Sequence, residues 1–277
     1  MTIAGSAGSP ARAPAVRVWL RIFFRGGLLS YRALFAWVDP RVYIPSMLAF
    51  PLFQLLFFAY VGRAASFQDD TFYVVGNAIM TANAGALFGT SFTIGGERWT
   101  QTLSSVLATP ANRFALFVGR ALPNIANGLL VSAFCFVMGW LLLDVPITAS
   151  QVPALAVVVL VSTVSCACLG LVIGSIGLRA RDAVLYANLA YFAMLVFCGV
   201  NVPLDELPGW MAAIGRGLPL THGIEAGREI AAGATLSDVA GLLGIEALVG
   251  AVYAALAYVL FRLFEAEGRR RASFETY

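Results

Sequence analysis

Lysine is absent from this sequence, and charge of either sign is scarce. All 18 basic residues are arginines, and charged residues make up only 12% of the 277 residues. Soluble domains average about 25% charged residues. A chain without lysine has no P-loop of the form GxxxxGK[ST], no Schiff-base lysine and no kinase-type catalytic lysine. If ATP drives this protein, we expect another polypeptide to bind the nucleotide.

Side chains for catalysis or metal binding are also rare. His222 is the single histidine, which excludes a metal cluster built from histidines. Cys166 and Cys168 lie two residues apart, so they point to different faces of a helix and cannot readily pair or chelate. No intramembrane pair of aspartates and no serine near His222 is predicted. We therefore expect no metal site, no cofactor bound by this chain and no enzymatic activity of its own.

Long uncharged stretches are what the sequence has in abundance, with 60% hydrophobic residues and a mean hydropathy of +0.82. A membrane-spanning helix needs about 20 apolar residues to cross about 30 Å of hydrocarbon. Six stretches predict such spans, and the fold class is an all-α polytopic membrane protein. The predicted spans are residues 42–62, 71–95, 118–143, 154–178, 183–203 and 245–264. They belong to a single membrane domain over residues 16–265, between a disordered tail at 1–15 and a C-terminal tail at 266–277.

The arginines predict the orientation of these spans. Fifteen of the eighteen fall in segments on one side of the alternating topology, and only Arg63, Arg216 and Arg228 fall on the other. Cytoplasmic loops of membrane proteins carry the excess of basic residues. Both termini are therefore expected in the cytoplasm, in a multi-pass protein of the plasma membrane.

Residues 16–37 predict an amphipathic helix in the cytoplasmic interface. At about 100° per residue, Arg17, Arg21 and Arg25 fall in one narrow stripe, and apolar residues cover much of the rest of the surface. Such a stripe contacts lipid headgroups, so membrane lipid is an expected partner and nucleic acid is not. The alternative is an ordinary basic flank with no mechanical role.

Two segments outside the spans are unusually apolar. Residues 96–120 contain a short helical pattern that ends at Thr109-Pro110, and this helix needs a partner surface in its own bundle or on another protein. The segment from 202 to 237 is too apolar for a free loop and too broken by proline to cross the bilayer. It predicts a re-entrant or interfacial helical hairpin on the outer side. Its characteristic residues are Pro203, Pro208, Trp210, Pro219 and His222.

Apart from Arg120 near the start of the third span, the first five spans contain no acidic, basic or histidine side chain, which disfavours an ion-coupled transporter or proton channel. Glu246 is expected at the outer interface, where the last span starts. Spans two and five carry uncharged polar residues, and these have two interpretations. Either they pack helices together, or they line a path for an amphipathic substrate. The candidates for the path are Asn77, Thr81, Asn83, Asn188 and Tyr191.

The loop after the second span resembles the signature of type 2 ABC exporter permeases, which reads E-R-x-x-G-T-L-E followed by T-P. The matching residues are Glu97, Arg98, Thr102, Leu103, Thr109 and Pro110. Gln101 replaces the usual glycine, and Ser104 replaces the second glutamate. The outer segment is similar to that family as well, from Pro203 through Leu207-Pro208 and Trp210 to Pro219–His222. The resemblance covers roughly residues 20–265.

This resemblance implies the membrane subunit of an ABC exporter of the drug-efflux, nodulation-factor or polysaccharide type, which includes exporters of antibiotics. Two permease subunits, as copies or paralogues, would pair with two separate ATPase subunits that bind ATP and Mg. A coupling helix would pass the motion of the ATPase to spans two and five. Its residues would be Glu97, Arg98, Gln101, Thr102, Leu103 and Leu107.

The uncharged polar and aromatic residues of spans two and five suit a lipid-like cargo better than ions, and the resemblance implies an exporter. The expected substrate is an amphipathic or lipid-like molecule (a drug, a natural product or a lipid-linked glycan), which leaves through a bacterial plasma (inner) membrane. The alternative function is a non-transporting membrane scaffold or assembly factor that uses the apolar loop helix as a docking surface.

Overall fold

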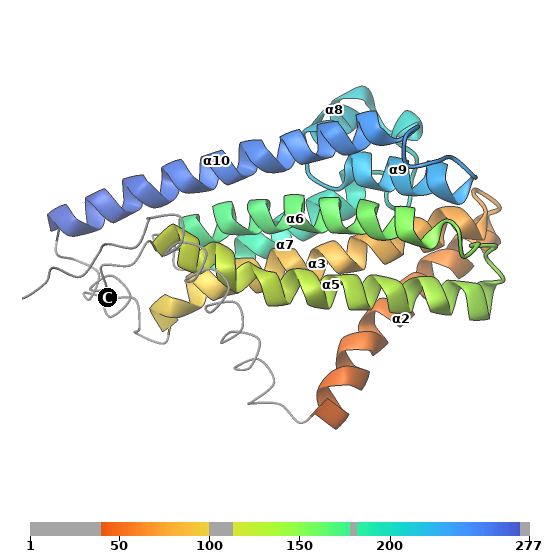
Figure 1. The fold of residues 1–277 in the computed structure, drawn as a ribbon, viewed down its shortest axis with the longest axis horizontal. Helices are drawn as coiled ribbons and strands as arrows, with labels where there is room; N and C mark the ends of the chain where they lie inside the picture. The colour runs from red at the N-terminus through yellow and green to blue at the C-terminus, as the bar shows by residue number, and fades with distance from the viewer. Residues whose placement is uncertain (1–39, 100–112, 178–181, 272–277) are drawn as a thin grey trace, which may run out of the picture.

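The computed structural model describes residues 40–99, 113–177 and 182–271, and every regular element in these ranges is a helix. The longest helices run side by side along the molecule, and the short helices α8 and α9 lie near one end (Figure 1). The elements are α2 (Pro40–Ala65), α3 (Asp70–Trp99), α5 (Arg113–Leu143), α6 (Val152–Gly177), α7 (Ala183–Phe197), η1 (Leu204–Glu206), α8 (Gly209–Gly217), α9 (Thr221–Ala231) and α10 (Ala240–Arg271). The predicted interface helix at 16–37 lies outside the described residues.

Four of these helices are long and apolar enough to cross a membrane. Their apolar windows are Met47–Ala65 in α2, Ala121–Leu143 in α5, Val152–Gly177 in α6 and Ala240–Leu263 in α10. The 26 residues of α6 extend about 39 Å, which exceeds the thickness of the hydrocarbon layer. α3 is longer still but falls outside these four, because its asparagine, threonine and serine residues make it less apolar.

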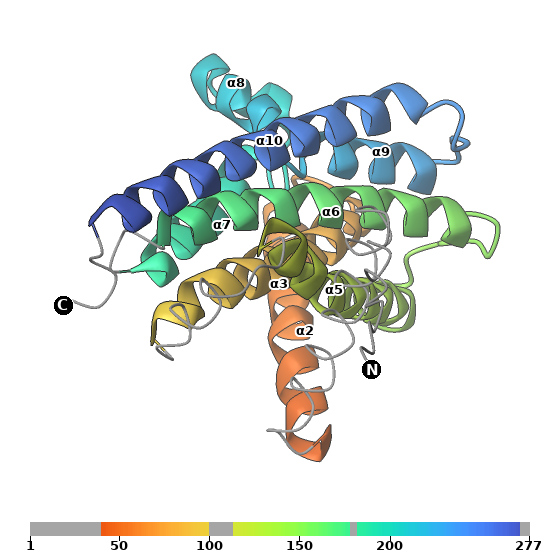
Figure 2. The same ribbon diagram turned by 60° about the vertical axis from the view of Figure 1, so that its left-hand side comes forward.

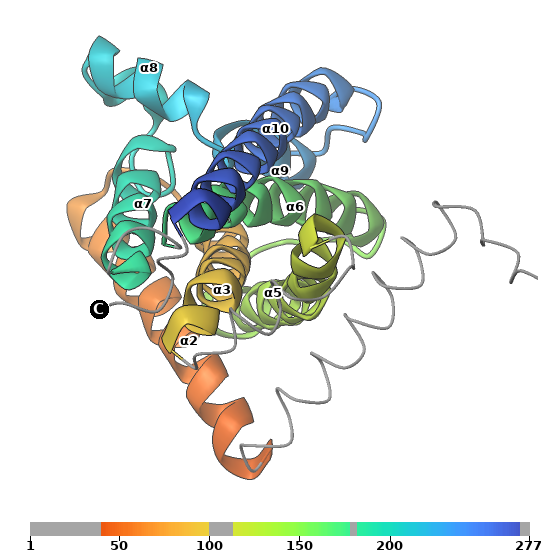
Figure 3. The same ribbon diagram turned by 90° about the vertical axis from the view of Figure 1, so that its left-hand side faces the viewer.

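α3 occupies the middle of the bundle. It contacts α2, α5, α6, α7 and α9, and the end-on view shows it enclosed by its neighbours (Figure 3). Every residue from 72 to 83 is buried. Neighbouring helices approach α3 closely where they carry glycine. A Cβ added to Gly128 on α5 would lie 2.6 Å from the carbonyl oxygen of Ala82, and one added to Gly170 on α6 would lie 2.8 Å from that of Leu87.

α10 covers one side of this bundle and lies along α6 (Figure 2). Its outward face exposes large apolar side chains such as Leu248, Val252 and Leu263, each about 60% exposed. Soluble monomers rarely expose apolar patches of this extent. An apolar outer face with a packed inner face is what a helix needs when hydrocarbon surrounds it.

α7 is shorter than the predicted span at 183–203. It begins where the Asp182 carboxylate accepts a hydrogen bond from the backbone N–H of Leu185 at 3.2 Å, and it ends at Phe197. Gly199 then adopts a left-handed conformation with φ of 74°, and Pro203 follows, so the helix cannot continue. Fifteen residues extend about 22 Å, less than the roughly 30 Å of the hydrocarbon layer. The predicted boundary was therefore wrong.

The segment predicted as an outer hairpin forms the short helices α8 and α9 rather than one long helix. α8 contacts α7, η1 and α9, whereas α9 is packed against α3, α6 and α10. The backbone turns sharply between the two helices at Leu220, whose φ is 103°. α9 is thus part of the bundle.

Candidate functional site

A chain of uncharged polar side chains joins α2, α3 and α7 next to the centre of the molecule. Asn77 is fully buried on α3, and its Nδ2 donates to Asn201 Oδ1 at 2.8 Å while its Oδ1 accepts from Gln54 Nε2 at 3.2 Å. The hydroxyl of Tyr191 on α7 donates to Gln54 Oε1 at 2.8 Å. We call Gln54, Asn77, Tyr191 and Asn201 the amide cluster. No charged side chain takes part in these bonds.

The amide cluster holds three helices together across an apolar interior. A buried amide or hydroxyl without a partner is costly, and mutual hydrogen bonds remove that cost. The Nδ2 of Asn77 also donates to the carbonyl of Tyr73 one turn earlier, at 3.0 Å. Gln54 and Asn201 are only partly buried, so the cluster reaches from the interior toward the surface between α2 and α7.

The structure brings together two of the five side chains predicted to line a path, Asn77 and Tyr191. Each of the other three bonds to a backbone carbonyl of its own helix, and Thr81 Oγ1 also lies 3.6 Å from Cys135 Sγ on α5. Thr81 Oγ1 donates to the carbonyl of Asn77 at 2.9 Å, Asn83 Nδ2 to that of Ile79 at 2.9 Å and Asn188 Nδ2 to that of Val184 at 2.8 Å. Thr81 and Asn83 are buried and Asn188 is half-buried. The Oδ1 of Asn83 has no hydrogen-bond partner among the described residues.

Asn201 and Gln54 are the two members of this cluster that the sequence did not predict as site residues, and the clearer signal belongs to Gln54. It is the one amide within the predicted span at 42–62, which is otherwise dominated by apolar side chains. A lone amide in a membrane-spanning stretch indicates a partner on another helix, and that signal points to Gln54. The identity of its partners, 23 and 137 residues further along the chain, depends on the fold.

Glu246, expected from the sequence at the outer interface, is enclosed by protein between α10 and the start of α9. Its side chain is fully buried on α10, where Oε1 accepts from the backbone N–H of Leu220 at 2.7 Å and Oε2 from that of Gly223 at 3.3 Å. The first N–H groups of a helix lack partners within the helix and favour a negative charge. Glu246 supplies acceptors for two N–H groups at the start of α9.

Side-chain contacts also fix the later turns of α9 to its neighbours. Arg228 Nη2 donates to the carbonyl of Val200 at 2.9 Å, and its guanidinium lies 3.4 Å from the centre of the Phe72 ring. Burial lowers the pKa of Arg228 to about 9, so the side chain still carries its charge at pH 7. At the end of the helix, Gln151 Nε2 donates to the carbonyl of Ile230 at 2.9 Å. α9 is therefore fixed to α10, α3, α6 and the turn after α7.

The outer-segment residues have distinct surroundings. Pro208 is the cap residue of α8, and Trp210 in the first turn is 60% exposed with its ring 6.0 Å from that of Phe197. His222 is buried in the first turn of α9, and its Nδ1 lies 3.9 Å from Glu246 Oε2. Burial is the largest cause that lowers the pKa of His222, and it outweighs the attraction of the Glu225 carboxylate. Pro203 and Pro219 flank η1 and α9.

Most of the predicted coupling and interface residues are not described. Gln101, Thr102, Leu103 and Leu107 lie outside the described residues, as do Arg17, Arg21 and Arg25. Glu97 and Arg98 belong to the last turn of α3, where the helix continues to Trp99. Within the described ranges, no group of three His, Cys, Asp or Glu side chains is placed to hold a metal ion.

A family model described as ABC-2 type transporter matches residues 27–231, which include the amide cluster, α8 and α9. No curated protein matches the chain.

Proposed function

The chain belongs to the ABC-2 type transporter family, and on that premise we propose that it is the membrane-spanning subunit of an exporter. The family makes it the membrane component of an ABC transporter, and the resemblance noted in its sequence is thereby confirmed. The proposal adds the direction, the cargo and the partners. The complex would move an amphipathic or lipid-like molecule out of a bacterial cell across the inner membrane.

The amide cluster is the observation that carries the proposed cargo. Gln54, Asn77, Tyr191 and Asn201 offer hydrogen bonds from neutral groups only. A wall of amides, a phenol and apolar side chains suits a molecule with scattered polar groups on an apolar body. It offers no fixed charge to an inorganic ion or a proton. Movement of α2 or α7 away from α3 would free these groups to face a cargo.

Exposed aromatic side chains support pairing with a second permease subunit. Phe50, Phe53, Phe57 and Tyr60 recur along α2 at intervals of three, four and three residues, and each is more than half exposed. This is the spacing of residues that contact a partner helix along one seam. A second copy or a paralogue seated on this stripe would place two amide clusters on either side of one interface.

α3 supports the proposed link to the ATPase. It is an unbroken helix from Asp70 to Trp99 with no proline inside. Glu97 and Asn77 lie 20 residues apart on it, which corresponds to about 30 Å along the axis. A push on the end that carries Glu97 and Arg98 would therefore reach the amide cluster. Two ATPase subunits with bound ATP and Mg would supply that push, because this chain has no lysine for a P-loop of its own.

Transport in inside-out membrane vesicles tests the proposal. Vesicles that contain this chain together with an ATPase encoded beside its gene would be supplied with ATP and a panel of drugs, natural products and lipid-linked glycans. We expect ATP-dependent, vanadate-sensitive accumulation of at least one of these amphipathic compounds inside the vesicles. If no compound accumulates and the chain still binds other membrane proteins, the scaffold function is favoured instead.

A further inference from the structure

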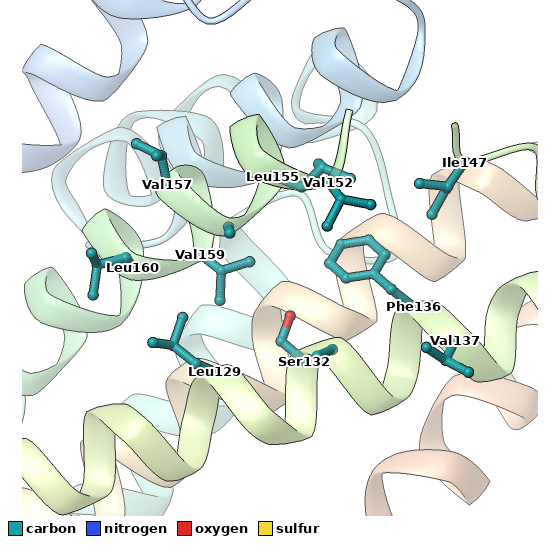
Figure 4. Close-up of a pocket in the computed structure, with 12 residues that line it drawn as sticks. Leu129, Ser132, Phe136, Val137, Ile147, Val152, Leu155, Val157, Val159 and Leu160 are labelled. Carbon is teal, nitrogen blue, oxygen red and sulfur yellow. The ribbon is translucent and has the colours of Figure 1, made fainter. Parts of the chain in front are cut away.

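An apolar groove runs between α5 and α6 on a side of the bundle away from the amide cluster. Its volume is about 450 Å³, and residues 129–137 of α5 line one wall while residues 152–160 of α6 line the other. Eleven of its twelve lining residues are apolar. In Figure 4, Leu129, Ser132 and Phe136 of α5 extend toward α6, and Val152 and Val159 of α6 extend toward α5.

The groove is open to the surroundings of the bundle. Val137 on α5 is 48% exposed and Val152 on α6 is 54% exposed, whereas Leu155 and Val159 at the floor are buried. Both helices are long and apolar enough to cross a membrane. In a bilayer, the mouth of this groove therefore faces hydrocarbon and not water.

Water is a poor occupant because the groove offers it almost nothing to bond. A buried water molecule needs two to four polar partners, and Ser132 is the one polar residue in the lining. Its side chain is buried, its Oγ has no hydrogen-bond partner among the described residues, and Figure 4 shows that oxygen directed into the groove. An empty space would deprive the lining side chains of dispersion contacts. A hydrocarbon chain is therefore the occupant that suits this lining.

We propose that the groove is a binding site for one acyl chain of a bilayer phospholipid. Each wall is nine residues long and extends about 12 Å, which is close to half the hydrocarbon thickness of about 30 Å. The site thus accommodates a chain from a single leaflet. The bound chain contacts Leu155 and Val159 beneath the outer surface, so it exchanges more slowly than lipid around the exposed faces. This inference depends on the chain lying in a membrane and does not depend on the direction or cargo of transport.

Photolabelling by lipid tests the proposal. The full-length chain would be reconstituted in palmitoyl-oleoyl phosphatidylglycerol vesicles that contain a small fraction of phosphatidylcholine with a diazirine on its acyl chain. After illumination, labelled residues are identified by peptide mass spectrometry. We expect labelling of residues 129–137 and 152–160 several-fold above that of the exposed face of α10 at Leu248 and Val252. Equal labelling of the groove and of α10 would contradict the proposal.

Matched substitutions make the test specific. Ala133→Phe on α5 and Ala156→Phe on α6 each add a ring at an exposed position in the lining, so the groove is filled without disturbance of the core. Ala126→Phe adds the same ring at an exposed position of α5 outside the groove. We expect the first two variants to lose the groove labelling and the third to keep it. Labelling that persists in both filled variants overturns the proposal. An Ala133→Cys variant that forms a disulfide-linked dimer also overturns it, because a second copy of the chain would then occupy the groove.

Discussion

The carboxylate of Glu246 on α10 accepts a hydrogen bond from the backbone N–H of Leu220 at 2.7 Å, immediately before the first turn of α9. The two residues are 26 positions apart in the sequence. Through this contact the last long helix of the chain determines where α9 begins. The second carboxylate oxygen reaches Gly223 in the same turn, and any Cβ at that position would collide with the Ser162 side chain. The start of α9 thus depends on α10 and α6 together.

Removal of the Glu246 carboxylate leaves two buried N–H groups without an acceptor. We expect Glu246→Ala to lower the free energy of unfolding by about 1–3 kcal/mol, the cost of unsatisfied buried donors. Glu246→Gln keeps one acceptor oxygen and should lose less. Thermal unfolding of the purified variants in detergent measures this, with the exposed Glu229→Gln on α9 as the control. An Ala variant as stable as the control would refute the capping role.

The bond between Tyr191 and Gln54 is accessible to a double-mutant cycle. Tyr191→Phe removes only the hydroxyl, and Gln54→Leu removes the amide, so the cycle isolates their coupling. We expect a coupling of about 0.5–1.5 kcal/mol in the unfolding free energy, the range for one hydrogen bond. Additive effects of the two substitutions would show that the bond contributes nothing to stability.

The close approach of α6 to α3 depends on Gly170. A Cβ there would lie 2.8 Å from the carbonyl oxygen of Leu87, so Gly170→Ala forces the helices apart. We expect a loss of about 1–3 kcal/mol in stability, typical of overpacking. Gly85→Ala on α3 is the matched control, because nothing lies within 4 Å of its Cβ position. That variant should be at least as stable as the parent, since alanine favours the helix. Equal losses in the two variants would contradict this account of the packing.

His222 makes stability depend on pH. Its pKa is lowered in the folded protein, chiefly by burial, with Glu225, Arg216 and Glu246 as the nearby charged or titratable groups. The unfolded chain therefore binds a proton more readily as the pH falls through about 6.5, and stability falls with it. We expect His222→Gln to lose less stability than the parent protein between pH 7 and pH 5. Melting temperatures of both proteins across that range measure the difference. If the melting temperatures of the parent and of His222→Gln fall equally with pH, His222 does not cause the pH dependence.

Much of this fold follows from simple patterns in the sequence, and the exceptions have physical causes. Charge-free stretches long enough to cross hydrocarbon predict helices at all six positions, because length and apolarity are local properties. The end of α7 was misplaced because the predicted span was bounded only by charged residues. Gly199 has a left-handed φ and ends the helix before any charged residue appears.

The candidate site was harder to predict than the helices. Asn77 and Tyr191 stand out as polar residues in apolar stretches, but their link through Gln54 requires knowledge of which helices are neighbours. Glu246 was placed at an interface because an isolated acid in a span normally avoids the interior. Its actual partners are backbone N–H groups at the start of α9. Every residue except proline has such a group, so the sequence does not indicate which ones Glu246 contacts.

The ATPase activity of the purified complex tests the central claim most directly. The full-length chain would be tagged, purified from membranes of cells that also express a candidate ABC ATPase, such as one encoded beside its gene, and assayed for vanadate-sensitive ATP hydrolysis. We predict that an ATPase with a GxxxxGK[ST] motif co-purifies, and that Glu97→Ala or Arg98→Ala reduces hydrolysis coupled to the permease while both variants still insert in the membrane. A pure complex without ATPase subunits or ATP hydrolysis would contradict the account.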